Sequence, residues 1–243
     1  MPTKKGGSAK EVALLETLKP WLLGIFASHR PSEYIAVEFA EEKLYLHLRV
    51  QFNGPDLSDM DIAVSKLDKP PRQIERECWL GVHRNNAVER LKPWGKYAQR
   101  EIAGKGITVA ADFNFAMSCV AYQGKRYTNF LFVVFFYVLK LHAQQKGRTD
   151  YVIAADDASV SNGVSLHEVA VKKVLDSKMS LNAIMKTPLM YYERFGFVYP
   201  EKKEFFEKLL TTGTMEDLTR YYLDLKTLSL SKILKLAEEL QFK

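Results

Sequence analysis

The chain has 243 residues, of which 47% are apolar and 26% are charged. This balance is typical of a globular protein and excludes a largely disordered chain. Lysine and arginine number 35 against 29 acidic residues, so the formal charge is +6. The two cysteines, Cys78 and Cys119, have no second Cys or His at metal-ligand spacing. This argues against a zinc module, a CxxC redox site and a secreted disulfide framework, and it predicts an intracellular, cytoplasmic location.

The N-terminal segment predicts a short tail followed by a helix. Residues 1–10 carry lysine, glycine and serine without an apolar run, as in a disordered basic tail rather than a signal peptide. Residues 11–28 place apolar side chains three and four positions apart, which predicts an amphipathic helix interrupted near Pro20.

Two alternating segments, 34–40 and 44–52, predict an antiparallel hairpin that ends in a loop at 53–56. The following stretch, 66–105, contains ten basic and five acidic residues together with aromatic side chains. One interpretation is a surface for an anionic partner, either nucleic acid or a phosphorylated cofactor. The alternative is a solvated helical face with two tryptophans in the core.

The middle of the chain predicts a βαβ unit. Segments 107–111 and 115–122 predict a strand pair turned at 112–114, and Thr128 or Asn129 can cap a helix that ends at Gly147. Its apolar run, 130–139, is shorter than the roughly 20 residues of a membrane span, so we expect a buried element and no membrane span. A strand at 150–155 then lies parallel to the strand before the helix.

The C-terminal part predicts further helices. Asp156 and Asp157 follow a parallel strand, where they could bind a metal or form a plain turn, and a metal site is not our prediction. We expect a helix over 165–176, a helix end at Gly196 that leads into a last strand, and a helical segment over 201–243. The expected caps in that segment are Thr214 and either Ser229 or Ser231.

Common catalytic motifs are absent from the sequence. It contains no G-x-S-x-G, no Walker loop, no H-E-x-x-H and no G-x-G-x-x-G. The five histidines are scattered singly along the chain. These absences make hydrolase and nucleoside-triphosphatase functions poor candidates.

Two segments together resemble the GNAT superfamily of acyl-CoA-dependent N-acyltransferases. Residues 120–131, VAYQGKRYTNFL, resemble its strand-to-helix turn, and residues 192–197, YERFGF, resemble its closing helix and strand. The resemblance covers residues 107–200. It implies an α/β fold with a GNAT-like mixed, centrally parallel sheet flanked by helices, in a domain over 11–200 with an N-terminal helix and a C-terminal helical extension over 201–243.

The resemblance also implies a co-substrate, acetyl-CoA or another acyl-CoA. Backbone N–H groups at a helix N-terminus can hold its pyrophosphate without a particular side chain. Arg126 and Thr128 stand where the family pattern has small residues; they would crowd the phosphate, or Lys125 and Arg126 would bind it directly. The implied binding residues are Val120, Tyr122, Gln123, Gly124, Lys125, Arg126, Tyr127 and Thr128.

Three residues are candidates for the chemistry. Tyr192 stands where many family members have a tyrosine that protonates the CoA thiolate, and its alternative role is that of a core aromatic residue. Asp112 and Glu101 are candidate general bases for the acceptor amine. The predicted activity is acetyl transfer to an amine by direct attack in a ternary complex. The alternative functions are a catalytically inactive GNAT-fold scaffold and, less favoured, a nucleic-acid binder using residues 66–105.

Overall fold

The computed structural model describes residues 8–30, 32–39, 42–53, 56–66, 78–85, 109–118, 127–145, 151–156, 160–161, 164–213, 220–224 and 227–239. The strands are β1 (Ser32–Phe39), β2 (Glu42–Asn53), β3 (Asp56–Lys66), β4 (Cys78–Asn85), β5 (Val109–Ser118), β6 (Tyr151–Asp156), β7 (Val160–Ser161), β8 (Val164–Ser165) and β9 (Arg220–Asp224). The α-helices are α1 (Ser8–Ser28), α4 (Tyr127–Gln145), α5 (Leu166–Asp176), α6 (Leu181–Lys186), α7 (Lys202–Thr212) and α8 (Leu230–Glu239), and η4 (Tyr191–Phe195) is a 3-10 helix.

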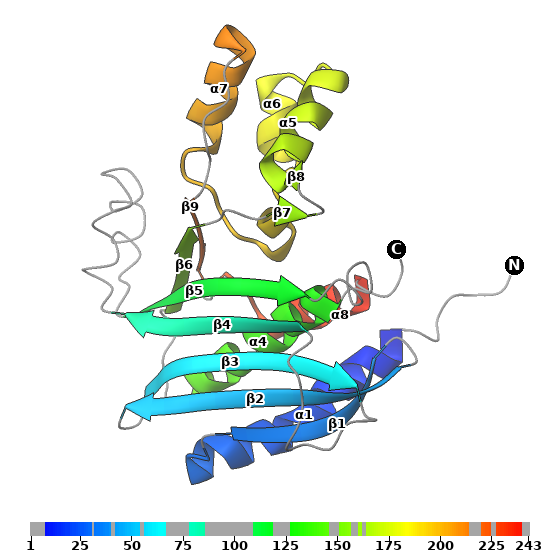
Figure 1. Cartoon of the computed structure of the whole chain (residues 1–243), viewed down its shortest axis with the longest axis vertical. Helices are drawn as coiled ribbons and strands as arrows, with labels where there is room; N and C mark the ends of the chain where they lie inside the picture. The colour runs from blue at the N-terminus through cyan, green and yellow to red at the C-terminus, as the bar shows by residue number, and fades with distance from the viewer. Residues whose placement is uncertain are drawn as a thin grey trace, which may run out of the picture.

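One mixed sheet organises the described residues (Figure 1). Its seven strands follow the order β1-β2-β3-β4-β5-β6-β9, and every neighbouring pair is antiparallel except β5 and β6, which are parallel. The prediction of an α/β protein with a mixed sheet is confirmed. The expectation of a centrally parallel sheet is wrong, because β5 and β6 are the only parallel pair among the described strands.

The predicted N-terminal hairpin is confirmed, with Tyr34 opposite His47 in the register of β1 and β2. The next strand, β3, was not predicted and pairs antiparallel with β2. Leucines alternate along β2 with less buried residues, so one face of this half of the sheet is apolar and the other is partly exposed. The buried residues of β2 and β3 on the apolar face are Leu44, Leu46, Leu48, Val50, Met60, Ile62 and Val64.

The predicted strand pair with a turn at 112–114 is wrong, since β5 runs continuously from Val109 to Ser118. Gly81 of β4 opposes Phe115 while Val82 opposes Phe113, so Asn114 is an extra residue in β5. A β-bulge absorbs one such residue without ending the strand. Asp112 therefore lies inside a strand and not in a turn.

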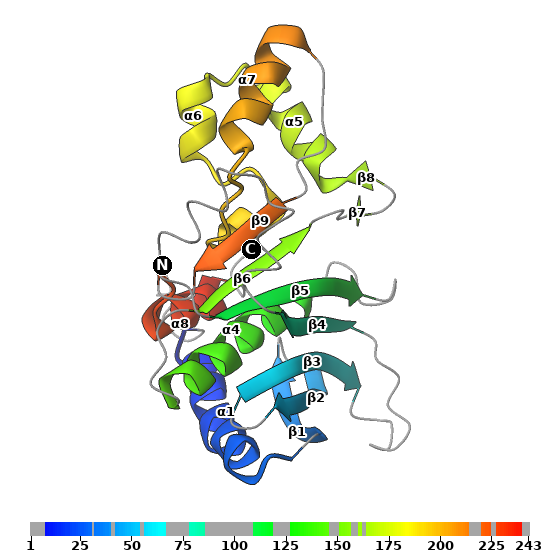
Figure 2. The ribbon, with the colours of Figure 1, turned by 90° about the vertical axis from the view of Figure 1, so that its left-hand side faces the viewer.

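A layer formed by α1, α4 and α8 covers the apolar face of the sheet (Figure 2). The predicted helix over the aromatic run is confirmed as α4, in which all residues from Phe130 to Leu139 are buried. The predicted caps are wrong, because α4 begins at Tyr127 and so contains Thr128 and Asn129. Helix α1 contains Pro20 without interruption, contrary to the prediction. Five buried residues of α1 hold the helix against the core on both sides of the proline: Leu15, Leu18, Leu22, Ile25 and Phe26.

A helical unit made of α5, α6, η4 and α7 lies between β6 and β9 in the chain and extends beyond one edge of the sheet (Figure 1). Helix α5 confirms the helix predicted over 165–176. Gly196 caps η4 in the left-handed region with φ 89°, which confirms the predicted stop, since glycine adopts this conformation without steric cost. The strand predicted after Gly196 is reduced to a single bridge residue, Val198.

The C-terminal segment 201–243 is more than a helical extension. It contributes α7 and also the edge strand β9, which pairs antiparallel with β6. Its last helix, α8, begins after Ser229, whose Oγ accepts the N–H of Lys232 at 3.2 Å, so the predicted cap at Ser229 is confirmed. The predicted cap at Thr214 lies outside the described residues.

The basic stretch 66–105 is described only at Lys66 and over β4. A helical face is the wrong interpretation for β4, which is a strand, and the remainder of the stretch lies outside the described residues. In the part of the chain that the structure describes, no helix is both long enough and apolar enough to cross a membrane.

Tyr137 of α4 gives the helical layer a measurable property. Burial raises the pKa of its phenol to about 12, and the negative charge of Glu16 on α1 adds to this effect. The unfolded chain ionises Tyr137 near pH 10 and the folded chain does not, so this residue lowers the free energy of unfolding as pH rises from about 10 to 12. We expect the wild type to lose about 2–3 kcal/mol of unfolding free energy over that interval and Tyr137→Phe to lack this loss. Urea denaturation of both proteins at pH 8 and pH 11.5 measures it, and equal pH dependence would contradict it.

Candidate functional site

The parallel strands β5 and β6 pair over only part of their length. Their register runs from Val109 opposite Tyr151 to Asp112 opposite Ala154. Beyond Asp112, residues 113–118 of β5 pair with β4, and the last residues of β6 pair with β9. Figure 2 shows the two strands moving apart toward their C-terminal ends. Within the described residues, the side of 113–118 that faces β6 has no strand partner.

The bulge at Asn114 coincides with the point where β5 leaves β6. A bulge bends its strand and increases the local twist. Asp112 is the last residue of β5 that pairs with β6, and Asn114 follows two residues later. The bulge therefore accounts physically for the separation of the two strands.

Helix α4 begins close in sequence to this separation. Strand β5 ends at Ser118 and α4 starts at Tyr127, so the predicted turn joins the end of β5 to the N-terminus of α4. The first N–H groups of a helix have no intrahelical partner and carry partial positive charge. Of the predicted binding residues, Tyr127 and Thr128 are the first two of α4. The others, Val120, Tyr122, Gln123, Gly124, Lys125 and Arg126, lie outside the described residues.

Tyr192 lies in the hydrophobic core. This tyrosine is 4% exposed. Its ring makes edge contacts with the rings of Phe132 in α4 and Phe197, at centroid distances of 5.5 and 5.8 Å. These contacts place η4 against the first half of α4. They favour the interpretation of Tyr192 as a core aromatic residue over that of a proton donor to a bound thiolate.

Among the predicted bases, the structure locates Asp112 and leaves Glu101 outside the described residues. Asp112 is opposite His83 of β4 on one side and Ala154 of β6 on the other. His83 is in turn opposite Asp59 of β3. Sequence analysis did not predict this alignment, because Asp59, His83 and Asp112 are far apart in the chain and only the strand register brings them to one level of the sheet.

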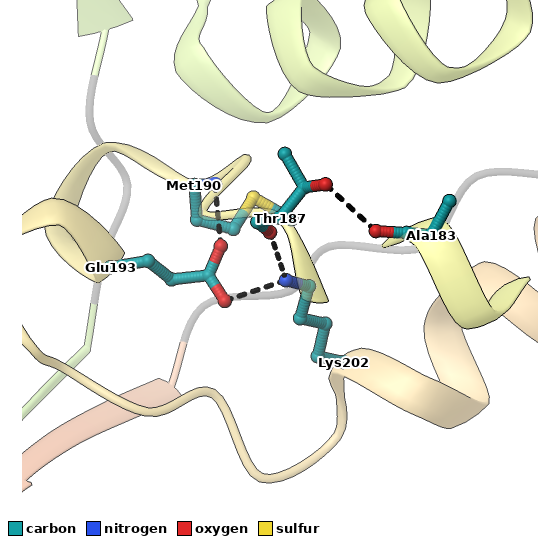
Figure 3. A network of polar contacts seen from close by, with 5 residues as sticks. All are labelled: Ala183, Thr187, Met190, Glu193 and Lys202. Carbon is teal, nitrogen blue, oxygen red and sulfur yellow. Dashed lines mark hydrogen bonds and ion pairs between the residues drawn. The ribbon is translucent and has the colours of Figure 1, made fainter. Parts of the chain in front are cut away.

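A buried ion pair joins three parts of the helical unit (Figure 3). Nζ of Lys202, at the start of α7, lies 2.7 Å from Oε1 of Glu193 in η4 and donates to the carbonyl of Thr187 at 2.9 Å. Oε2 of Glu193 accepts the backbone N–H of Met190 at 2.9 Å. The side chains of Lys202 and Glu193 are 5% and 13% exposed. The pair joins the end of α6, the start of η4 and the start of α7, and so holds the segment that carries Tyr192.

Metal binding has no support among the described side chains, where no three His, Cys, Asp or Glu residues gather. Asp156 ends strand β6 opposite Arg220 of β9, whereas Asp157 lies outside the described residues. The C-terminal end of β6 is therefore an ordered, paired strand up to Asp156.

No family model matches this chain, and no curated protein or solved structure matches it significantly. The predicted resemblance to the N-acyltransferases therefore rests on the sequences of residues 120–131 and 192–197 alone.

Tyr192 permits a direct test of its surroundings. We expect Tyr192→Ala to lower the free energy of unfolding by about 3–5 kcal/mol, because it leaves a cavity against Phe132 and Phe197. Tyr192→Phe keeps the ring and is expected to change stability by about 1 kcal/mol or less and any acyl transfer by no more than about twofold. Chemical denaturation and steady-state kinetics measure both effects. A hundredfold loss of kcat in Tyr192→Phe would instead identify the phenol as a proton donor.

The buried ion pair gives a second prediction. Lys202→Met leaves the Glu193 carboxylate buried without its cation, and we expect a loss of about 3–5 kcal/mol. Adding Glu193→Gln removes that charge but keeps an oxygen for the Met190 N–H, so the double variant should be more stable than Lys202→Met alone. The control is Lys203→Met, which breaks an exposed pair with Glu207 and should cost about 1 kcal/mol or less. Equal losses in the two lysine variants would show that the buried pair has no special role.

Proposed function

We propose that this chain is an acyl-CoA-dependent N-acyltransferase of the GNAT type, which transfers an acetyl or longer acyl group from CoA to an amine. The observation that carries the proposal is the separation of β5 from β6 next to the N-terminus of α4. The sequence 120–131, which resembles the family's pyrophosphate turn, joins these same two elements.

The separated strands suit the chemistry of CoA. Its pantetheine arm carries two amide groups, which can hydrogen-bond to an extended backbone as an added strand does. The open side of 113–118 offers such a backbone. The pyrophosphate would then lie toward the turn and the first N–H groups of α4, where partial positive charge stabilises an anion. Lys125 and Arg126 supply two further positive charges in the turn.

The reaction requires no covalent enzyme intermediate. The amine nitrogen attacks the thioester carbonyl carbon, a C–N bond forms, and the C–S bond breaks with its electron pair leaving on sulfur. The ammonium loses two protons in total, one to a base and one to the departing thiolate. Holding both substrates in one complex and placing a backbone N–H of the bulged strand near the carbonyl oxygen would supply most of the acceleration. The predicted bases for the acceptor amine are Asp112, the last residue of β5 in register with β6, and Glu101.

One observation favours the alternative, a catalytically inactive scaffold of the same fold. Tyr192, the proton donor that the family resemblance implies, is buried and packs against the rings of Phe132 and Phe197. An active enzyme would then protonate the thiolate with a proton from the amine or from water. The two functions differ in turnover and also in whether the chain needs to bind CoA.

Binding of CoA is the first test. We expect wild type to bind acetyl-CoA and the double variant Lys125→Glu/Arg126→Glu to lose at least about tenfold in affinity for each reversed charge, because two attractive charges near phosphate become repulsive. The control is Lys172→Glu/Lys173→Glu, which makes the same charge change on exposed positions of α5 and should bind like wild type. Isothermal titration calorimetry measures all three proteins. Equal affinities would remove the turn from the site, and no binding by wild type would reject the transferase.

A further inference from the structure

Three rings contact one another on strands β1 and β2. Tyr34 of β1 stacks on His47 of β2, with 5.6 Å between ring centroids and 27° between ring planes. The same tyrosine makes an edge contact with Tyr45 of β2 at 5.6 Å. The register accounts for both contacts, because Tyr34 is opposite His47 and Tyr45 lies two residues before His47 on the same side of β2. Tyr34 is 46% exposed, and the other two residues are half-buried.

These rings lie on the face of the sheet away from α1, α4 and α8. Alternate residues over 44–50 of β2 are buried in the core that the helices cover, so Tyr45 and His47 belong to the opposite face. On β3 that face is closed, since Ala63 and Ser65, opposite His47 and Tyr45, are buried. The exposed surface is therefore a band along β1 and β2, at the edge of the sheet farthest from the helical unit (Figure 1).

The residues of β2 on this band include cations and no acid. In chain order they are Lys43, Tyr45, His47, Arg49 and Gln51. The lysine, the arginine and the glutamine are exposed. Six residues of strand separate the two cations, which places them about 20 Å apart along β2 with the rings between them. This arrangement complements an extended polymer that carries both negative charges and flat bases.

Two acidic residues border the band. Glu38 of β1 is opposite Lys43, and Oδ2 of Asp61 on β3 lies 3.9 Å from Nη1 of Arg49. That distance is longer than a hydrogen bond, and the arginine side chain is 52% exposed against 27% for the aspartate. An exposed ion pair of this kind is weak, so the guanidinium can still bind a phosphate.

We propose that this band binds single-stranded nucleic acid, with a base stacked on Tyr34 and phosphates beside Lys43 and Arg49. A single strand exposes the faces of its bases, which stack on aromatic side chains whatever the sequence, while cations hold the backbone. A polyanion without bases would gain nothing from the exposed ring. The site is independent of the proposed acyl transfer, because β3 and β4 separate it from β5 and β6. It also uses none of the residues 66–105.

The first experiment tests stacking. Fluorescence anisotropy measures binding of the full chain to a labelled 12-nucleotide thymidine strand and to an abasic strand with the same phosphates. We expect wild type to prefer the thymidine strand by at least about fivefold. Tyr34→Ala should weaken binding of that strand by about 5–150-fold and leave the abasic strand unaffected, whereas Tyr34→Phe keeps the ring and should bind like wild type.

Two results of this experiment overturn the proposal. One is a wild type that binds neither strand or binds both equally. The other is a Tyr34→Ala protein that retains the preference for the thymidine strand. If Tyr34→Ala does not fold, Tyr34→Leu makes the same comparison, because it keeps an apolar side chain beside His47 without an aromatic ring.

The second experiment tests the cations. Arg49→Gln should weaken binding of both strands and reduce the slope of log affinity against log salt concentration by about 0.7, the value for one phosphate contact of a single strand. Asp61→Asn should strengthen binding, since it removes the negative charge beside Arg49. The matched control, Lys172→Gln, removes a positive charge from an exposed position of α5 and should leave the slope unchanged. Equal effects of the Arg49 and Lys172 substitutions would indicate attraction by net charge alone and overturn the band as the site.

Discussion

Burial of α4 against the sheet is the interaction on which the rest of the structure depends. Ten consecutive residues, Phe130 to Leu139, are buried, so every side of this helix is covered along that length. The sheet covers one side, and α1, α8 and η4 cover others. A helix that is apolar all round must be enclosed, and four separate segments of the chain are brought together to enclose it. The same burial holds the N-terminus of α4 beside the end of β5.

The sheet that packs against α4 combines antiparallel and parallel strand pairing. From β1 to β5 it is antiparallel, with one face on the core and one turned away from the helical layer. The crossover through α4 forces β6 parallel to β5, while the bulge at Asn114 turns the end of β5 aside. A parallel pair that separates partway leaves backbone groups available on a rigid element. Rigid strands hold functional groups more precisely than loops do, and the proposed acyl transfer would depend on such precision.

The helical unit between β6 and β9 is attached to α4 by aromatic packing, and one buried charge pair holds its own parts together. Phe195 of η4 stacks on Phe132 of α4 at 4.9 Å between ring centroids, and Glu193 of the same short helix pairs with Lys202 of α7. A buried pair of this kind contributes little net stability when intact but is costly to break, so it defines geometry more than it adds stability. Tyr192 is consequently held in one orientation, as a support for α4.

Local sequence patterns were sufficient to predict the elements that depend only on residues within a few positions of one another. The hairpin of β1 and β2, helix α4, the parallel β6, helix α5, the stop at Gly196 and the cap at Ser229 all follow from alternation, capping residues or glycine within a few positions. The single strand β5 was missed because Asp-Phe-Asn favours a turn locally, and pairing with β4 and β6 outweighs that preference. Strand β9 was missed because it forms by pairing with β6, a strand far away in the sequence. The burial of Tyr192 and the alignment of Asp59, His83 and Asp112 depend on packing and register between distant segments, and no local pattern encodes which strands become neighbours.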